Sequence, residues 1–121
     1  RYAVEALASY DFVFVHIESP DTAGHAADVQ QKIKAIEEID RHIVGPLHHA
    51  LKGYGDYRLL VLPDHPTPIE KRTHVADPVP FAMCGRGIER SQTLPFDESS
   101  TSKAALQFDE GCRLIERFIS Q

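Results

Sequence analysis

The sequence has no tryptophan, a single methionine and only two cysteines in 121 residues. Cys84 and Cys112 are too few and too far apart for a disulfide framework or a zinc–thiolate cluster. Both are most simply interpreted as small core residues of a protein from a reducing compartment. A cytoplasmic location is therefore expected.

Basic residues are also scarce, with 13 Lys and Arg against 18 Asp and Glu and a formal net charge of −5. This balance argues against a nucleic-acid partner, because such partners require cations to neutralise phosphates. No apolar run approaches the roughly 18 residues that span a membrane, and no signal-peptide pattern is present, so no membrane partner is expected. Because the chain starts at Arg1 within a helical pattern, we expect a fragment of a longer protein.

Apolar patterning predicts a single α/β domain with a parallel sheet. Hydrophobic residues make up 42% of the chain, which is enough to form a packed core. The expected elements are strands at 11–17, 57–62 and 79–84, helices at 28–49 and 103–120, and loops at 18–21 and 66–80. Asp28 is the expected N-cap of the first of these helices.

Aspartates and histidines follow the first two predicted strands. Asp21 and His25 come after the first strand, Asp64 and His65 directly after the second, and His74 nine residues later. Because ligands bind at the carboxyl ends of parallel strands, these five side chains are expected to converge at one sheet edge. Their oxygen and nitrogen donors suit Mn²⁺, Zn²⁺ or Co²⁺. Five ligands suggest two metals, an arrangement that supports phosphoryl transfer.

Structural roles are the alternative for each of these residues. Asp21 could act as a turn or capping residue, Asp64 could end a strand, and His74 could be a solvated loop residue. The histidines on the long predicted helix are interpreted as members of its polar face rather than as ligands; they are His42, His48 and His49.

Four linked motifs resemble the archaeal-type, cofactor-independent phosphoglycerate mutases of the alkaline phosphatase superfamily. They span residues 14–25 (FVHIESPDTAGH), 34–40 (KAIEEID), 62–68 (LPDHPTP) and 72–81 (RTHVADPVPF). The resemblance implies a three-layer α/β/α fold with a mostly parallel sheet, part of an alkaline-phosphatase-like core. Residues 1–121 would form the C-terminal part of the metal-binding domain, without its N-terminal part and without the substrate-binding domain.

The resemblance also implies a metal-ligand set. Asp21, His25 and His74 would hold one divalent ion, and Asp64 with His65 would hold the other. Mn²⁺ is favoured, Zn²⁺ is possible, and no bisphosphoglycerate cofactor is implied. The family's nucleophilic serine and its N-terminal aspartate ligand have no counterpart here, so this chain supplies no catalytic nucleophile.

The implied activity is the glycolytic interconversion of 3-phosphoglycerate and 2-phosphoglycerate through a phosphoserine intermediate. Arg72 could bind the phosphate of this small substrate or be a solvated arginine. The 121-residue chain alone is expected to be inactive. A related metal-dependent phosphotransferase, such as a proposed homoserine kinase, and a non-catalytic metal-binding module are alternatives. Self-association through an open sheet edge is also expected.

Overall fold

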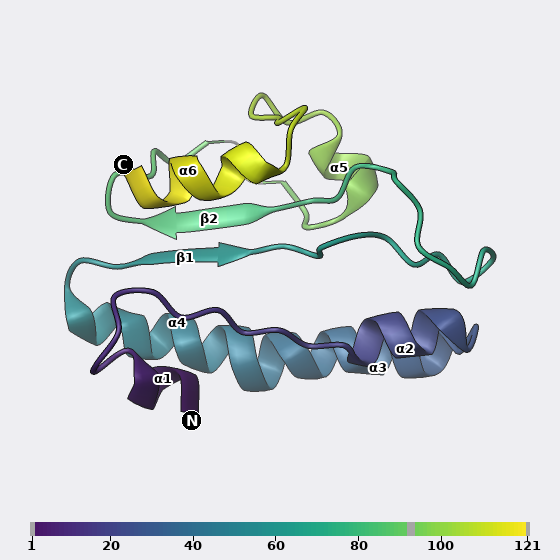
Figure 1. Ribbon diagram of the computed structural model, residues 1–121, viewed down its shortest axis with the longest axis horizontal. Coiled ribbons are helices and arrows are strands. Elements are labelled where there is room, and N and C mark those ends of the chain that lie inside the picture. Colours follow the sequence, from purple (N-terminus) through teal and green to yellow (C-terminus); the bar gives the residue numbers. More distant parts are fainter. Residues whose placement is uncertain (1, 92–93, 121) are drawn as a thin grey trace. The chain divides into compact units, whose positions relative to one another are not determined.

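A computed structural model describes residues 2–91 and 94–120, and the chain divides into two compact units (Figure 1). The first unit comprises Arg1–Gly55 with Pro66–Val75, and the second comprises Asp56–His65 with Ala76–Gln121. The chain therefore leaves the first unit after Gly55, returns to it at Pro66 and leaves it again after Val75.

The first unit is helical. Its elements are α1 (Tyr2–Ala6), α2 (Ser19–His25), α3 (Val29–Ile39), the π-helical turn η1 (Asp40–Val44), α4 (Gly45–Leu51) and the 3₁₀ turn η2 (Lys52–Tyr54). Helix α2 packs against α3, as the ribbon shows (Figure 1). The small side chains of Ala23 and Ala35 are buried, which allows these two helices to approach closely.

The long helix predicted at 28–49 is confirmed, with an irregular middle. Asp28 is its N-cap, since its side chain accepts a hydrogen bond from the backbone N–H of Gln31 at 2.9 Å. The π-helical turn η1 comes just before Pro46, whose missing N–H and ring a regular α-helix would not accommodate. The helical segment ends at η2, and Gly55 follows it with a φ of 78°.

The second unit contains an antiparallel pair of strands, β1 (Arg58–Val61) and β2 (Ala82–Gly85). Leu59 lies opposite Cys84, and Leu60 opposite Met83. Helices α5 (Glu98–Thr101) and α6 (Cys112–Ser120) complete the unit. The Arg58 guanidinium donates hydrogen bonds to the last carbonyls of α6, at 2.7 Å to Phe118 and 2.9 Å to Ile119. This contact satisfies orphan helix carbonyls and ties α6 to β1.

Helix α5 begins at an N-cap formed by Asp97. The Asp97 carboxylate accepts hydrogen bonds from the backbone N–H of Ser100 at 2.7 Å and from the Ser100 hydroxyl at 2.9 Å. The backbone hydrogen bond is the main cause that lowers the pKa of this carboxyl below its ordinary value.

The prediction of a parallel sheet is wrong for the strands that the structure describes. Within residues 2–91 and 94–120 the sheet is the antiparallel pair β1–β2. A parallel pair needs a crossover, usually through a helix, and the segment that joins β1 to β2 contains none. The three-layer arrangement is not confirmed by the described elements.

Three predicted segments also differ from the structure. Residues 11–17 do not form the expected strand, since no strand in the described ranges pairs with them. Residues 19–21 lie in α2 rather than in a loop, because Pro20 is tolerated in the first turn of a helix. The last helix begins at Cys112 rather than at 103, immediately after Gly111. Cys112 is exposed, so its expected place in the core is wrong, whereas Cys84 is half-buried.

No helix in the described part of the chain is both long enough and apolar enough to cross a membrane.

Candidate metal centre

Helix α2 places Asp21 and His25 on one face. The two residues are four positions apart, and residues with this spacing lie above one another along a helix. One Asp21 carboxylate oxygen, Oδ2, lies 3.4 Å from Nε2 of His25. Asp21 and His25 of the Asp-x-x-x-His motif therefore lie side by side on a helix, whereas the sequence predicted that Asp21 lies in a loop.

His74 comes from the loop of residues 66–75, which belongs to the same unit. Two backbone hydrogen bonds shape this loop. The N–H of Val75 donates to the carbonyl of Pro66 at 3.1 Å and closes the base of the loop beside His74. The N–H of Arg72 donates to the carbonyl of Pro68 at 2.9 Å, which makes a single helical turn at its tip.

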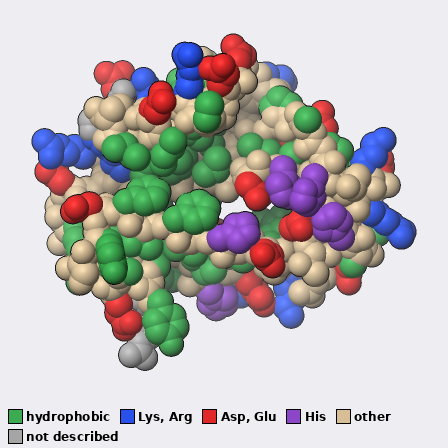
Figure 2. Space-filling model, in the orientation of Figure 1, with side chains coloured by type: hydrophobic (Ala, Val, Ile, Leu, Met, Phe, Trp, Pro, Cys, Tyr) green, Lys and Arg blue, Asp and Glu red, His purple; other side chains and the backbone are tan. Residues whose placement is uncertain are grey.

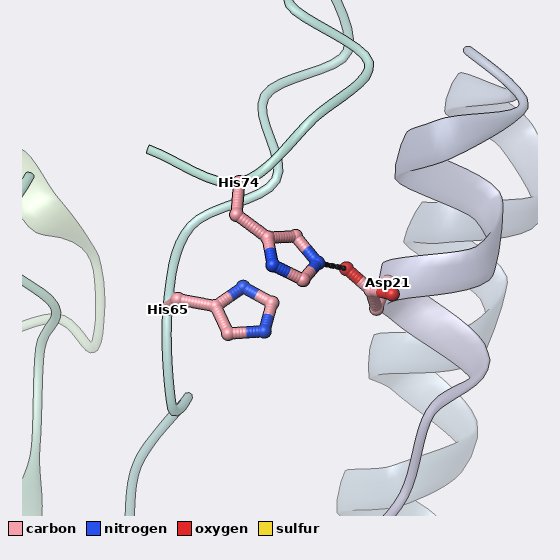
Figure 3. Close-up of side chains that lie close together, drawn as sticks. All are labelled: Asp21, His65 and His74. Carbon is pink, nitrogen blue, oxygen red and sulfur yellow. Dashed lines mark ion pairs between the residues drawn. The ribbon is translucent and has the colours of Figure 1, made fainter. Parts of the chain in front are cut away.

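Asp21, His25 and His74 meet within this unit. Nε2 of His74 lies 3.2 Å from Oδ1 of Asp21, and Nε2 of His25 lies 3.2 Å from Nε2 of His74. Figure 3 shows Asp21 reaching from its helix toward the His74 ring, with their ion pair dashed. The predicted trio is thus brought together, with each side chain within hydrogen-bonding or ion-pair distance of the others.

The ring of His25 is held in one orientation by the backbone of Arg72. Nδ1 of His25 lies 2.9 Å from the Arg72 carbonyl oxygen. A carbonyl oxygen can only accept a hydrogen bond, so Nδ1 of His25 must be the donor and carry the proton. In the neutral ring, Nε2 then has no proton and keeps its lone pair. That lone pair faces Asp21 and His74. A metal-binding histidine usually donates its other ring N–H to a backbone carbonyl, a carboxylate or water, and the contact of His25 with the Arg72 carbonyl is of this kind.

The donor set fits a divalent metal ion. Bonds of about 2.0–2.1 Å to a tetrahedral ion separate neighbouring ligand atoms by about 3.3–3.4 Å. The Nε2 atoms of His25 and His74 are 3.2 Å apart, close to this spacing. Asp21 places Oδ1 3.2 Å from His74 and Oδ2 3.4 Å from His25, so a carboxylate oxygen is available beside each ring. The side chains of Asp21, His25 and His74 are 35%, 43% and 52% exposed, so further ligands from solvent or substrate have access. Figure 2 shows histidine side chains at the surface, near acidic ones.

Three further residues of the first unit support this trio, and the sequence patterns did not single them out. The Thr67 hydroxyl donates a hydrogen bond to Oδ1 of Asp21 at 2.5 Å, and Lys32 Nζ donates to the Thr67 carbonyl at 2.6 Å. Gly24 lies against Thr67, since a Cβ on Gly24 would come within 2.7 Å of that carbonyl oxygen. The signal that could have identified Thr67 is its place between two prolines, which fix the backbone on both sides.

Asp64 and His65 belong to the second unit, directly after β1. Oδ2 of Asp64 lies 3.4 Å from Nε2 of His65, and Oδ1 accepts a hydrogen bond from the His65 backbone N–H at 3.1 Å. The contacts between Asp64 and His65 therefore orient these two side chains relative to each other. His65, which Figure 3 also draws, is bonded to Pro66, the first residue of the loop that carries His74.

The remaining predicted residues are placed as follows. The Arg72 side chain is exposed, and it is the Arg72 backbone that contacts His25. His42 and His49 are exposed on the long helix and His48 is half-buried there, which agrees with their interpretation as surface residues of that helix.

Comparison with known proteins shows a family match. Residues 1–108 match the family model described as "Metalloenzyme superfamily". The chain is also similar to a solved structure, that of the PH0037 protein from Pyrococcus horikoshii, with a TM-score of 0.87 and 34% sequence identity. This match covers 98% of the chain and 36% of that protein.

Curated relatives carry a common name. The chain is 51% identical over 116 residues to 2,3-bisphosphoglycerate-independent phosphoglycerate mutase 2 of Methanothermobacter thermautotrophicus, covering 96% of the chain and 29% of that protein. It is 51% identical over 121 residues to a mutase of the same type from Methanothrix thermoacetophila, covering 99% and 31%. It is 41% identical to a probable mutase of that type from Geobacter sulfurreducens, covering 98% and 30%. The chain thus spans less than a third of the length of these relatives.

Proposed function

Since the chain belongs to the metalloenzyme superfamily, we propose that it supplies metal ligands to a 2,3-bisphosphoglycerate-independent phosphoglycerate mutase. The reaction would interconvert 3-phosphoglycerate and 2-phosphoglycerate, and the substrate would be a small phosphorylated acid. The observation that carries the proposal is the His25 ring, whose Nδ1 donates to a backbone carbonyl while Nε2 faces Asp21 and His74.

Asp21, His25 and His74 would hold the first divalent ion. Two imidazole nitrogens and one carboxylate oxygen form a set of three protein ligands, and such a set leaves coordination positions open for substrate. Mn²⁺ and Zn²⁺ both accept these donors, and Mn²⁺ is the ion that we propose.

Asp64 and His65 would contribute to a second ion. The pair follows β1 directly, and the peptide bond from His65 to Pro66 links it to the loop that carries His74. Two protein ligands bind an ion more weakly than three, so we expect the second site to depend on ligands beyond this pair.

Divalent ions at such a centre stabilise negative charge on a transferring phosphoryl group. The chain's own residues would orient that chemistry. The Arg72 carbonyl would keep the His25 ring in one tautomer, and the closed loop would present His74. The exposed Arg72 guanidinium would contact the phosphate of the substrate. The phosphate-accepting serine that the family resemblance implies lies outside the matched motifs. A cytoplasmic location is part of the proposal.

The activity is tested by measuring interconversion of the two phosphoglycerates with this segment carried in a protein of the relatives' full length. We expect Mn²⁺-dependent turnover that is lost with a chelator and reduced at least about 100-fold by Asp21→Ala, since removing a metal ligand removes charge stabilisation in the transition state. His42→Ala, on the exposed helix surface, is the matched control and should leave the rate unchanged.

Metal-dependent phosphate transfer from ATP to homoserine, without phosphoglycerate interconversion, would contradict the mutase assignment while leaving the metal centre intact. Turnover that is insensitive to both the chelator and Asp21→Ala would contradict the metal centre itself.

A further inference from the structure

Thr67 is the most deeply buried polar residue in contact with the candidate metal centre. It is 4% exposed, and it is the buried polar residue of the described core. Its hydroxyl donates to Oδ1 of Asp21 at 2.5 Å, and the two residues are separated by 46 positions in the sequence. A buried hydroxyl retained beside a carboxylate ligand needs an explanation, because a buried polar group is costly unless it forms hydrogen bonds.

The backbone of Thr67 is fixed from two further directions. Lys32 Nζ, from α3, donates to its carbonyl oxygen at 2.6 Å. Gly24 of α2 leaves room for the same carbonyl, which would lie only 2.7 Å from a Cβ at that position. Pro66 and Pro68 restrict the chain on both sides. The hydroxyl is therefore presented to Asp21 by a backbone with little freedom to move.

The hydrogen bond acts on the atom that pairs with His74. Oδ1 of Asp21, which accepts from Thr67, is also the oxygen that lies 3.2 Å from Nε2 of His74, while Oδ2 faces His25. The hydrogen bond from Thr67 to Oδ1 restricts rotation of the Asp21 carboxylate. Oδ1 therefore stays beside His74 and Oδ2 stays beside His25. A carboxylate fixed in this way loses less conformational freedom when it coordinates an ion.

We infer that Thr67 is a positioning residue that orients Asp21 for metal binding, with Lys32 and Gly24 holding its backbone in place. This inference rests on the proposed metal centre. It goes beyond the ligand set, because Thr67 does not contact the ion and acts through Asp21. Loss of an outer partner of a metal ligand typically weakens metal binding by about 10–100-fold.

The test is a Co²⁺ titration of the 121-residue chain, followed by visible absorption, with thermal unfolding of each metal-free variant measured in parallel. Thr67→Val keeps the shape of the side chain and removes the hydroxyl, and we expect it to weaken Co²⁺ binding about 10–100-fold. Thr67→Ser restores the hydroxyl and should bind within about threefold of the wild type. Thr22→Val, an exposed threonine on the same helix as Asp21, is the matched control and should bind like the wild type.

Each outcome decides a separate question. Wild-type affinity in Thr67→Val would overturn the role of Thr67 and leave the metal centre standing. If the wild type itself binds no Co²⁺, the proposed metal centre is wrong and the inference is overturned with it. If Thr67→Val does not fold, Thr67→Ala takes its place with the same expected loss. Failure of both to fold would show that Thr67 is needed for the fold, and weak binding by a folded Thr67→Ser would show that the hydroxyl is not what orients Asp21. Either result overturns the inference.

Discussion

At the scale of single residues, the proposed metal site depends on a backbone contact at Arg72 as well as on side chains. Arg72 has a φ of 55°, in the left-handed region that costs a non-glycine residue about 1–2 kcal/mol. The hydrogen bond from the Arg72 N–H to the Pro68 carbonyl stabilises this conformation. The Arg72 carbonyl oxygen then lies 2.9 Å from Nδ1 of His25. The five aspartate and histidine candidates could be predicted from residue type and spacing. This carbonyl contact could not, because an arginine gives no sign in the sequence that its backbone adopts a positive φ.

The two parts of Arg72 are therefore expected to have separable roles. Arg72→Met keeps the carbonyl and removes the guanidinium, so Mn²⁺ affinity should stay within about threefold of the wild type. In a metal-loaded protein of the relatives' full length, affinity for the proposed substrate 3-phosphoglycerate should fall about tenfold. Calorimetry measures both affinities. Lys71→Met removes the adjacent exposed cation and should change neither. A large loss of Mn²⁺ affinity in Arg72→Met would contradict this separation.

At the scale of elements, α2 and the segment at Thr67 are in contact through Asp21 and Gly24. The sequence predicted the Asp28 cap, the long helix and β1 well, because capping residues and apolar spacing are local signals. It did not predict that Asp21 lies on a helix or that Gly24 lies against Thr67. The close approach of Gly24 is a tertiary contact between segments far apart in the chain, and no local pattern encodes it.

A side chain at Gly24 should disrupt this contact. Gly24→Ala would place a Cβ 2.7 Å from the Thr67 carbonyl oxygen, and the overpacking should lower the free energy of unfolding by about 1–3 kcal/mol. Urea denaturation measures the change. Gly53→Ala is the matched control, because a Cβ there meets nothing within 4 Å and the substitution should be neutral or stabilising by at most about 1 kcal/mol. Equal stabilities of the two variants would show that α2 has room to shift.

At the scale of the whole molecule, the two units divide the five predicted ligands. Asp21, His25 and His74 belong to the first unit, and Asp64 and His65 to the second. The predicted parallel sheet is not confirmed, because the two strands that the structure describes, β1 and β2, are antiparallel and the segment between them contains no crossover helix. Self-association through a sheet edge stays a prediction.

The metal site proposed for the first unit consists of Asp21, His25 and His74. Its most direct test is a calorimetric titration of the chain with Mn²⁺, alongside Asp21→Ala and His42→Ala. The wild type and His42→Ala should each bind Mn²⁺ saturably, with Asp21→Ala losing at least about 100-fold in affinity, because a ligand of the ion is removed. Saturable binding of wild-type strength in Asp21→Ala would contradict the account.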